Sequence, residues 1–503
     1  MSRPVDRAIG ERTGGRAAGG RRPARIALLL LLILAFAPTA GHAHQRLVRS
    51  EPARETALDA APREIRFFFV EPIELTFTSV ELLGPEGTNV PLGELRLHRD
   101  SANVLIAPIA GPLSREGGYV VRWATASRDG HPVRGEFTFT IAPGAAGLAP
   151  DPAVAEPSLT EPAAPPAVAP PAAIPTFTAE SPAYVAIRWV MYLALVGVLG
   201  AVVFALVVLG LVRRREPGSE LTDPARRHAA GVGLAFAVVL ILAALARLYA
   251  QSLAMHGSAA ALDGSRVAAM LSQTLWGWGW ILQVGAAVIA TLGFLLARGG
   301  AGGGWALAAL AALVLSVTPA LSGHAGAMTG PIGSAAVVAD SVHVLAAGGW
   351  LGSLLVLLIA GIPAAMRLGT GRRSAGVATL VRAFSPTALL FAGLLVLTGV
   401  FAAFVHSGSF SALVASDYGR LLLLKLGIFL LVFATGAYNY LRVRPALGDE
   451  VGTHRLRRSA TVELAMGAAV LLVTALLVAT ARPYEEHEME MAIPSHAEAE
   501  HEV

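Results

Sequence analysis

Eight apolar segments, each close to the ~20 residues that a helix needs to cross the bilayer core, constrain this chain more than any other feature. They lie at about 184–212, 229–250, 272–297, 305–322, 334–361, 383–405, 421–441 and 460–481. Composition agrees, because 54% of the residues are hydrophobic and only 15% are charged, against about 25% charged in a soluble domain. We therefore expect residues 182–482 to form an all-α membrane bundle of eight transmembrane helices.

The arginines between these segments predict the orientation of the bundle. One set of alternating connections carries Arg213, Arg214, Arg215, Arg226, Arg227, Arg298, Arg367, Arg372, Arg373, Arg382, Arg442, Arg444, Arg455, Arg457 and Arg458. The other set has only Arg266 and Arg420. Because cytoplasmic loops are enriched in basic residues, the arginine-rich set lies inside, and both ends of the chain are expected outside. The sequence pI of about 9.7 thus reflects membrane topology, and we expect no nucleic-acid partner.

The segments outside the bundle differ sharply in composition. Residues 1–43 combine an arginine-rich start, a short apolar run and Gly41-His42-Ala43, which is typical of an export signal cleaved after Ala43. Residues 143–181 are rich in Pro and Ala and predict an extended linker. Residues 483–503 form an acidic tail with three His and two Met. We expect this tail to be either a disordered acidic segment or an arm that binds metal ions with low affinity through its His and Met side chains.

Residues 44–142 have a β-strand pattern. Short β-rich runs such as Ile65–Val70 and Tyr119–Trp123 alternate with turn sequences such as Gly84-Pro85-Glu86-Gly87. The run Phe137–Ile141 alternates apolar and polar residues, as a half-buried strand does. About a hundred residues of this pattern predict an all-β sandwich, Ig-like or cupredoxin-like with Greek-key connections.

Candidate metal ligands in this β-domain are nitrogen and oxygen donors. The chain contains no cysteine, so thiolate ligands are excluded. His44 would offer an imidazole and, after cleavage, a free α-amine. Asp129 and His131 are two residues apart and face the same way on an extended segment, while Glu71 follows an early apolar run. These donors suit a tetragonal Cu(II) site, although an Asp-Gly turn followed by a solvated histidine is the simpler interpretation of Asp129–His131 alone.

Polar residues in the predicted spans form a second group of candidates, because ionisable groups inside a membrane are costly and usually functional. Asp340 and His343 are three residues apart and share a helix face. The other candidates in the outer halves or at the outer ends are Arg188, Arg247, His256, His324, His406 and Lys425. Lys425 would alternatively snorkel to the surface, and the histidines at helix ends would be solvated.

The third predicted span carries a stripe of Trp276, Trp280 and Gln283. An interfacial aromatic belt is one interpretation of its tryptophans, and a functional surface beside the candidate ligands is the other. Glu463, near the inner end of the last span, is interpreted as a capping or packing residue.

The β-domain resembles the periplasmic copper-resistance protein CopC. The matching stretches are Ser50-Glu51-Pro52-Ala53, Phe69-Val70-Glu71-Pro72, Gly118–Trp123, Ser127–Pro132 and Gly135–Phe139. The resemblance implies that His44, Asp129 and His131 bind Cu(II) and that Glu71 is a ligand or a neighbour of one. CopC proteins with a Met-rich Cu(I) site also exist, but residues 44–182 contain no methionine.

The membrane part resembles CopD, the membrane partner of CopC. The matching stretches are Thr274–Gly277, Leu321–Ala325, Asp340–Leu345, Gly349–Gly352, Phe384-Ser385-Pro386 and Tyr418–Lys425. A CopC–CopD fusion would be a multi-pass protein of the bacterial cytoplasmic membrane that carries or delivers copper. Asp340, His343 and His324 are then the first candidates for a membrane copper site, ahead of His256, His406, Lys425 and Trp276.

Three functions compete at this stage. The first is transport of copper, with Cu(II) captured by the β-domain and passed to the bundle, in the direction of import. The second is an oxidoreductase, either haem-containing with helix-borne histidines or of the cupric-reductase type. The third is a copper-delivery assembly factor that transports nothing and serves periplasmic copper proteins. We favour the first, which makes this chain a carrier rather than an enzyme, with copper ions and the lipid bilayer as its partners.

Overall fold

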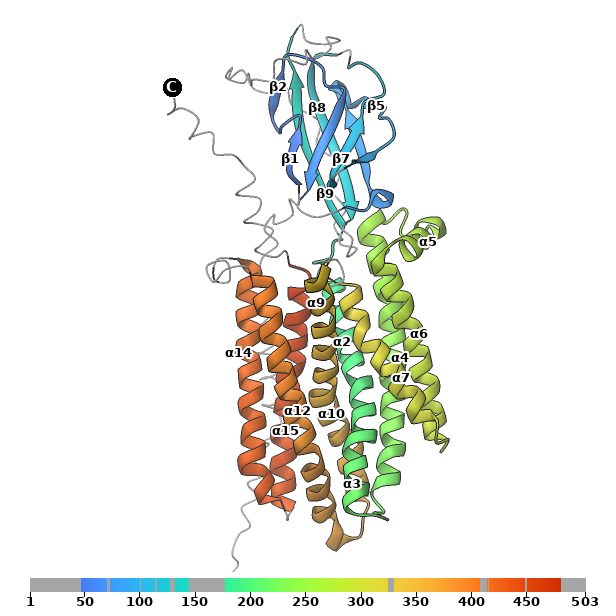
Figure 1. The fold of residues 1–503 in the computed structure, drawn as a ribbon, viewed down its shortest axis with the longest axis vertical. Coiled ribbons are helices and arrows are strands. Elements are labelled where there is room, and N and C mark those ends of the chain that lie inside the picture. The colour runs from blue at the N-terminus through green and yellow to red at the C-terminus, as the bar shows by residue number, and fades with distance from the viewer. Residues whose placement is uncertain are drawn as a thin grey trace, which may run out of the picture. The chain divides into compact units, whose positions relative to one another are not determined.

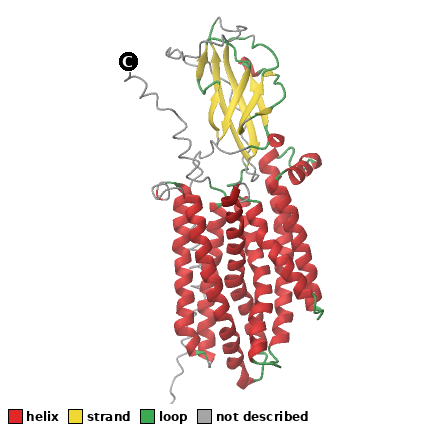
Figure 2. Cartoon of the chain, viewed as in Figure 1, coloured by secondary structure: helices red, strands yellow, loops and turns green. Residues whose placement is uncertain are grey.

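The computed structural model describes residues 47–69, 73–99, 101–113, 115–126, 132–143, 177–323, 330–407, 414, 416–447 and 450–480. The predicted export signal, most of the predicted linker and the acidic tail therefore lie outside the described residues. The described part consists of a β-domain and a helical bundle (Figures 1 and 2).

Two sheets form the β-domain, as the alternating pattern predicts. The four-stranded sheet has the order β1-β3-β7-β6 and the five-stranded sheet has the order β2-β9-β8-β4-β5. All pairs are antiparallel except β2 with β9. The strands are β1 (Leu47–Glu51), β2 (Thr56–Leu58), β3 (Glu64–Phe69), β4 (Ser79–Leu83), β5 (Asn89–Val90), β6 (Arg96–His98), β7 (Ser101–Pro108), β8 (Gly117–Ala126) and β9 (Pro132–Ile141), with short 3-10 turns η1 (Leu75–Phe77) and η2 (Pro85–Gly87).

The core of the sandwich comes from alternate residues of both sheets. In β9, Phe137, Phe139 and Ile141 are at most 5% exposed, which confirms the interpretation of that run as a half-buried strand. Trp123 packs edge-on against Phe69 of the other sheet, with ring centroids 5.2 Å apart. The two-sheet sandwich expected from the sequence is thus present, with one core shared by its two sheets.

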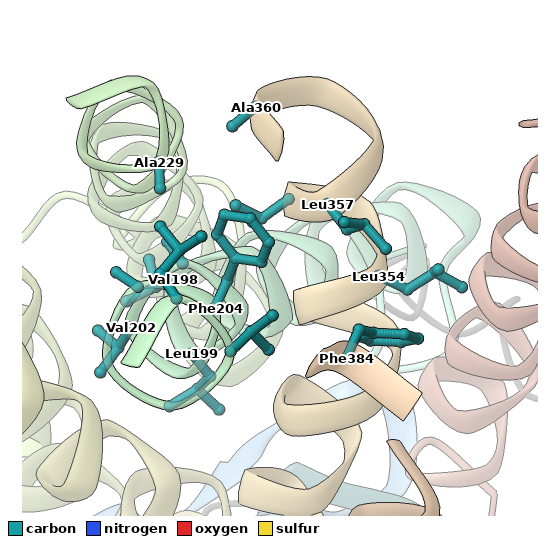
Figure 3. Close-up of a cluster of buried hydrophobic side chains, with 14 of the residues drawn as sticks. Val198, Leu199, Val202, Phe204, Ala229, Leu354, Leu357, Ala360 and Phe384 are labelled. Atoms are coloured by element: carbon teal, nitrogen blue, oxygen red, sulfur yellow. The ribbon is translucent and has the colours of Figure 1, made fainter. Parts of the chain in front are cut away.

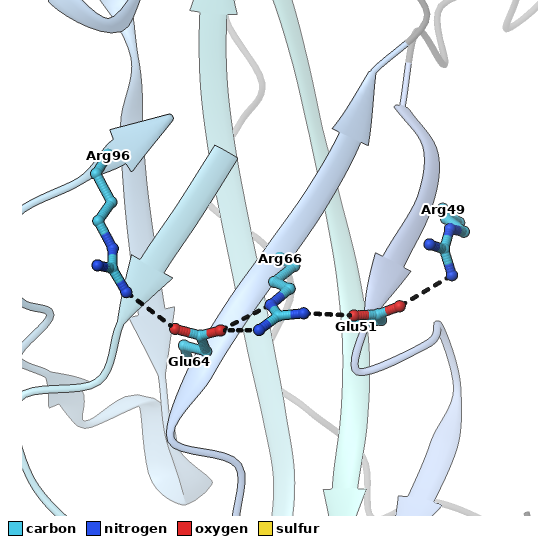
Figure 4. A network of polar contacts seen from close by, with 5 residues as sticks. All are labelled: Arg49, Glu51, Glu64, Arg66 and Arg96. Carbon is cyan, nitrogen blue, oxygen red and sulfur yellow. Dashed lines mark hydrogen bonds and ion pairs between the residues drawn. The ribbon is translucent and has the colours of Figure 1, made fainter. Parts of the chain in front are cut away.

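A row of charges covers part of the outer face of the four-stranded sheet (Figure 4). Arg66 lies between Glu51 and Glu64, at 3.8 and 2.6 Å. Arg49 and Arg96 extend the row, at 2.9 Å from Glu51 and 3.4 Å from Glu64. Because most of these side chains are exposed, each pair contributes at most about 1 kcal/mol. The row is a solvated face and not a metal site.

Eight helices within the described residues are long and apolar enough to cross a membrane, as the sequence predicts. The elements of the bundle are α2 (Pro182–Val203), η3 (Phe204–Val208), α3 (Leu209–Arg215), α4 (Thr222–His256), α5 (Gly264–Gln273), α6 (Leu275–Arg298), α7 (Gly304–Leu321), α9 (Gly330–Ala347), η4 (Gly348–Gly352), α10 (Ser353–Val356), η5 (Leu357–Gly361), α11 (Ile362–Met366), η6 (Thr370–Arg372), α12 (Arg373–Ser407), α14 (Asp417–Tyr438), η7 (Asn439–Val443), η8 (Arg444–Ala446) and α15 (Glu450–Leu477). The first span joins α2, η3 and α3, the fifth runs from Pro331 to Met366, and the seventh joins α14 and η7.

The first and fifth spans form the centre of the bundle. They are 78% and 72% buried over their apolar windows, whereas the sixth and seventh are 22% buried. Phe204 of the first span is fully buried and lies against the fifth span at Gly361. Figure 3 shows this ring among Val198, Leu357 and their neighbours. The outer spans thus leave their apolar surfaces for lipid.

Close contact between two glycines holds these central spans together. A Cβ atom added to Gly200 of α2 would lie 2.0 Å from the carbonyl carbon of Gly352. Because that obstacle is backbone, no side-chain rotation relieves it. We expect Gly200→Ala to cost 1–3 kcal/mol of stability or more, roughly the range for an overpacked core. Unfolding of the purified protein, followed by helical circular dichroism, measures this loss.

Gly210→Ala is the matched control, because it lies in the same span at a position where an added Cβ meets nothing within 4 Å. Alanine is the better helix former by about 1 kcal/mol, so this variant should be as stable as the parent or more stable. Equal stability of the two variants would contradict the proposed contact.

Candidate metal sites

The four predicted ligands of the β-domain, His44, Glu71, Asp129 and His131, all lie outside the described residues. The structure does describe the strands that flank them. His44 precedes β1, Glu71 follows β3, and residues 127–131 connect β8 to β9. The positions of these strand ends therefore show where the ligand-bearing segments attach to the sandwich.

Three contacts bring those strand ends together. Leu47 at the start of β1 pairs with Phe69 at the end of β3. Phe69 in turn packs against Trp123, near the end of β8. The backbone N–H of Glu74 donates to the carbonyl of Ala126, the last residue of β8, at 2.9 Å. The described residues next to all three ligand-bearing segments thus meet at one end of the sandwich.

His343 is the best-defined metal-ligand candidate of the bundle. Its Nδ1 lies 2.9 Å from the hydroxyl oxygen of Thr398, and that hydroxyl donates its own proton to the carbonyl of Leu394 at 2.7 Å. With its proton given to that carbonyl, the hydroxyl oxygen is an acceptor for Nδ1–H, and in the neutral ring this arrangement leaves the lone pair on Nε2. A histidine held in this way presents Nε2 as a metal ligand.

Asp340 lies one turn from His343, half-buried, and Lys425 of α14 is close enough for the charges of Asp340 and Lys425 to interact favourably. The same lysine acts unfavourably on a charged His343. Arg188, Arg247 and Asp340 all interact electrostatically with Tyr192 and therefore lie around the same tyrosine. The carboxylate therefore lies in a region with three cationic side chains, and an incoming metal cation would have to compete with them.

The two buried arginines have partners of their own. Arg188 is 4% exposed, donates to the carbonyl of Ala179 at 2.9 Å and stacks on Tyr184 at 4.1 Å. Arg247 is 8% exposed and lies 5.1 Å from the ring centroid of Trp276. Stacking on an aromatic ring stabilises a desolvated guanidinium, so Trp276 is a partner of Arg247.

The stripe on α6 is a buried surface and not an interfacial belt. Trp276 and Trp280 are 2% and 9% exposed, and Gln283 is 1% exposed. Trp280 donates its indole N–H to the carbonyl of Ala244 at 2.7 Å. The belt interpretation was wrong because helical periodicity does not show which face of α6 packs against α4.

The other histidine candidates differ in how much the structure says of them. His256 ends α4 with its Nδ1 3.2 Å from the hydroxyl of Ser252. That hydroxyl donates to the carbonyl of Ala261, so the histidine serves local structure at the helix end. His324 and the side chain of His406 lie outside the described residues. Within the described part of the chain, no three His, Asp or Glu side chains are close enough to hold a metal ion.

For two residues of the bundle, Thr398 and Glu463, only the structure shows the contacts that suggest a role. Thr398, which orients His343, has no distinguishing sequence context. Glu463 is 3% exposed and accepts hydrogen bonds from Trp350 and Asn439, so it neither caps α15 nor serves only as packing. The sequence feature that could have pointed to Glu463 is its position as an isolated acidic residue within an apolar span.

Comparison with known families matches three parts of the chain. Residues 47–142 match the CopC domain, residues 178–334 match the copper resistance protein D-like N-terminal domain, and residues 378–477 match copper resistance protein D. The chain therefore belongs to the copper resistance and transport proteins that join a CopC domain to a CopD membrane region. With its eight apolar helices it is a multi-pass membrane protein.

Individual relatives cover these parts to different extents. The chain is 25% identical to "Copper transport protein CutJ" of Bacillus subtilis, over 91% of this chain and 78% of that protein. It is 28% identical to "Copper resistance protein D" of Pseudomonas syringae pv. tomato, over 58% of this chain and 94% of that protein. The crystal structure of CopC from Methylosinus trichosporium OB3b matches 20% of this chain and 93% of its own, with 29% identity and a TM-score of 0.17.

Proposed function

We propose that the β-domain captures Cu(II) outside the cytoplasmic membrane and that the bundle then carries the copper inward. The observation that carries the first step is the meeting of three strand ends beside His44, Glu71 and the 127–131 connection. Amine, imidazole and carboxylate donors suit Cu(II). The match to the CopC domain over residues 47–142 supports copper as the metal that this domain binds.

For the second step, the proposed acceptor in the bundle is His343 with Asp340 and His324. The support for His343 is its tautomer, which leaves Nε2 unprotonated and held in direction by Thr398. Asp340 is proposed to leave Lys425 and contact the metal when copper arrives. This exchange of one cation for another keeps the carboxylate compensated inside the membrane, where an uncompensated charge costs about 2.5 kcal/mol or more.

Copper uptake by cells with and without the gene tests this proposal. Cells that express the protein should accumulate more copper than cells that lack it, with external Cu(II) near the limiting range. Copper accumulation that falls when the protein is expressed would show export and overturn the proposed direction. Equal accumulation, together with a haem absorption band in the purified protein, would favour the oxidoreductase instead.

The proposed Cu(II) site makes a prediction about processing, because the α-amine of His44 can bind copper only if it is free. We expect the mature chain to begin at His44. Intact-mass measurement or N-terminal sequencing of protein purified from membranes checks this. A mature chain that begins at any other residue would remove the amine from the site and leave at most imidazole and carboxylate donors.

A further inference from the structure

Glu463 is a buried carboxylate that the proposed path of copper does not use. It lies on α15 and is 3% exposed. Its Oε1 accepts from the indole N–H of Trp350 at 3.0 Å and its Oε2 accepts from the amide of Asn439 at 2.8 Å. No ion pair to this carboxylate is found in the part of the chain that the structure describes. Two neutral donors alone do not compensate a charge in the membrane interior.

A cavity of about 210 Å³ opens beside this carboxylate, bounded by η4, α10, η5, α12, α14, η7, η8 and α15. Its lining is mainly apolar, with Glu463, Asn439, Tyr440 and Arg444 as the polar exceptions besides Trp350 and Ser385. Such a volume holds several water molecules. Leu441 and Tyr440, at the inner end of the seventh span, are exposed members of the lining. The cavity lining thus extends from the carboxylate to Arg444, one residue beyond the end of the seventh span.

Asn439 is suited to serve both protonation states of Glu463. With its Nδ2 donating to the carboxylate, its Oδ1 is buried and has no hydrogen-bond partner. A half-turn of the amide reverses the two atoms. Oδ1 then accepts from a protonated carboxyl, so the same side chain stabilises the ion in one orientation and the acid in the other.

Few titratable groups line the cavity beside Glu463. Arg444 and Tyr440 are the titratable groups that line the same cavity, and the guanidinium of Arg444 stacks on Tyr440 at 4.8 Å. The lining residues from α10 and α12 are neutral, as are those from the rest of α15. Desolvation by these neutral walls favours the uncharged acid. A neutral acid can ionise here only when the proton leaves through the cavity.

We propose that Glu463 binds and releases a proton through this inner cavity, with Asn439 as its positioning residue, and that this proton exchange accompanies copper movement. The second clause rests on the proposed transport function. The position of the fifth span supports it, because Trp350 lies seven residues, or roughly 10 Å at 1.5 Å per residue, from His343. The central fifth span therefore carries the proposed acceptor His343 and also supplies Trp350 to the proton site.

Infrared spectroscopy of the full-length protein in lipid nanodiscs tests the proton site without copper. We expect a protonated-carboxyl band near neutral pH that disappears on alkaline titration. Glu463→Gln should lack this band, while the exposed Glu220→Gln, whose parent side chain pairs with Arg372 at 3.2 Å, should keep it. Asn439→Leu should retain the band and shift its titration midpoint. A band unchanged in Glu463→Gln, or absent from the parent at every pH, would overturn the site.

Glu463→Asp is a second variant in case the glutamine variant does not fold, and its carboxyl should give a displaced band. Proteoliposomes with an internal pH dye then test the coupling. Copper added to the parent protein should move protons, and Glu463→Gln should abolish that movement. Copper uptake with no proton movement in the parent would overturn the coupling alone. No copper uptake at all would overturn the transport function, whereas the infrared band would still decide the proton site.

Discussion

His131→Ala should lower the affinity of the β-domain for Cu(II) by more than about 100-fold, which exceeds the loss typical of a residue that only supports a ligand. The reason is that alanine removes one of the few nitrogen donors and the remaining carboxylates bind Cu(II) less well. A competitive titration of residues 44–142, produced with a free amine at His44, measures the change. This fragment has its own hydrophobic core, so it can be studied alone.

His98→Ala is the matched control, because His98 is exposed on β6 and is not one of the predicted ligands. Its affinity for Cu(II) should stay within a few-fold of the parent. Binding by the parent should weaken below roughly pH 5–6, since imidazole must be neutral to bind metal and its ordinary pKa is about 6.5. Equal losses for the two histidine variants would reject the assigned site.

His343→Ala and Asp340→Asn should each abolish copper-dependent uptake while the protein remains at normal abundance in the membrane. Alanine at 343 removes the Nε2 lone pair that Thr398 directs. Asparagine at 340 removes the carboxylate charge that is proposed to compensate the metal cation inside the bundle. Uptake of isotopically labelled copper, normalised to the amount of protein in the membrane, is the measurement.

The interaction of Asp340 with Lys425 offers a different explanation, in which the pair only stabilises the bundle. On that explanation, Asp340→Asn should lower abundance because Lys425 is left inside a membrane span without its counter-charge. The double variant Asp340→Asn with Lys425→Gln should then restore abundance and uptake together. Normal uptake by a well-expressed His343→Ala protein would remove that residue from the copper path.

Thr398→Val tests whether Thr398 supports copper uptake by orienting the ring of His343. Valine keeps the shape of threonine and removes the hydroxyl oxygen that accepts from Nδ1 of His343. The ring then loses its orientation and its preferred tautomer, and uptake should fall by about 10- to 100-fold, as for other groups that orient a ligand. Thr435→Val is the control, since that hydroxyl is exposed and bonds only to the carbonyl of Leu431 of its own helix.

The architecture could be predicted from sequence because the signals behind it are local and repeated. Each span needs about 20 apolar residues regardless of its neighbours, and each strand of the sandwich alternates regardless of its partner. Phe137, Phe139 and Ile141 are buried as that alternation predicts. The alternation does not reveal the 3-10 turn Leu75–Phe77 that precedes β4, where two backbone N–H groups bond back to the carbonyls of Glu74 and Leu75.

Sequence alone determined the two-part construction of this protein and its eight spans, and it supplied the list of candidate copper ligands. Only the tertiary structure decided how those side chains are used. Trp276 became the partner of Arg247, Thr398 assigned the tautomer of His343, and Trp350 and Asn439 met Glu463 from residues 113 and 24 positions away. These contacts join separate helices, and apolar periodicity specifies that a helix buries a face without specifying what that face meets.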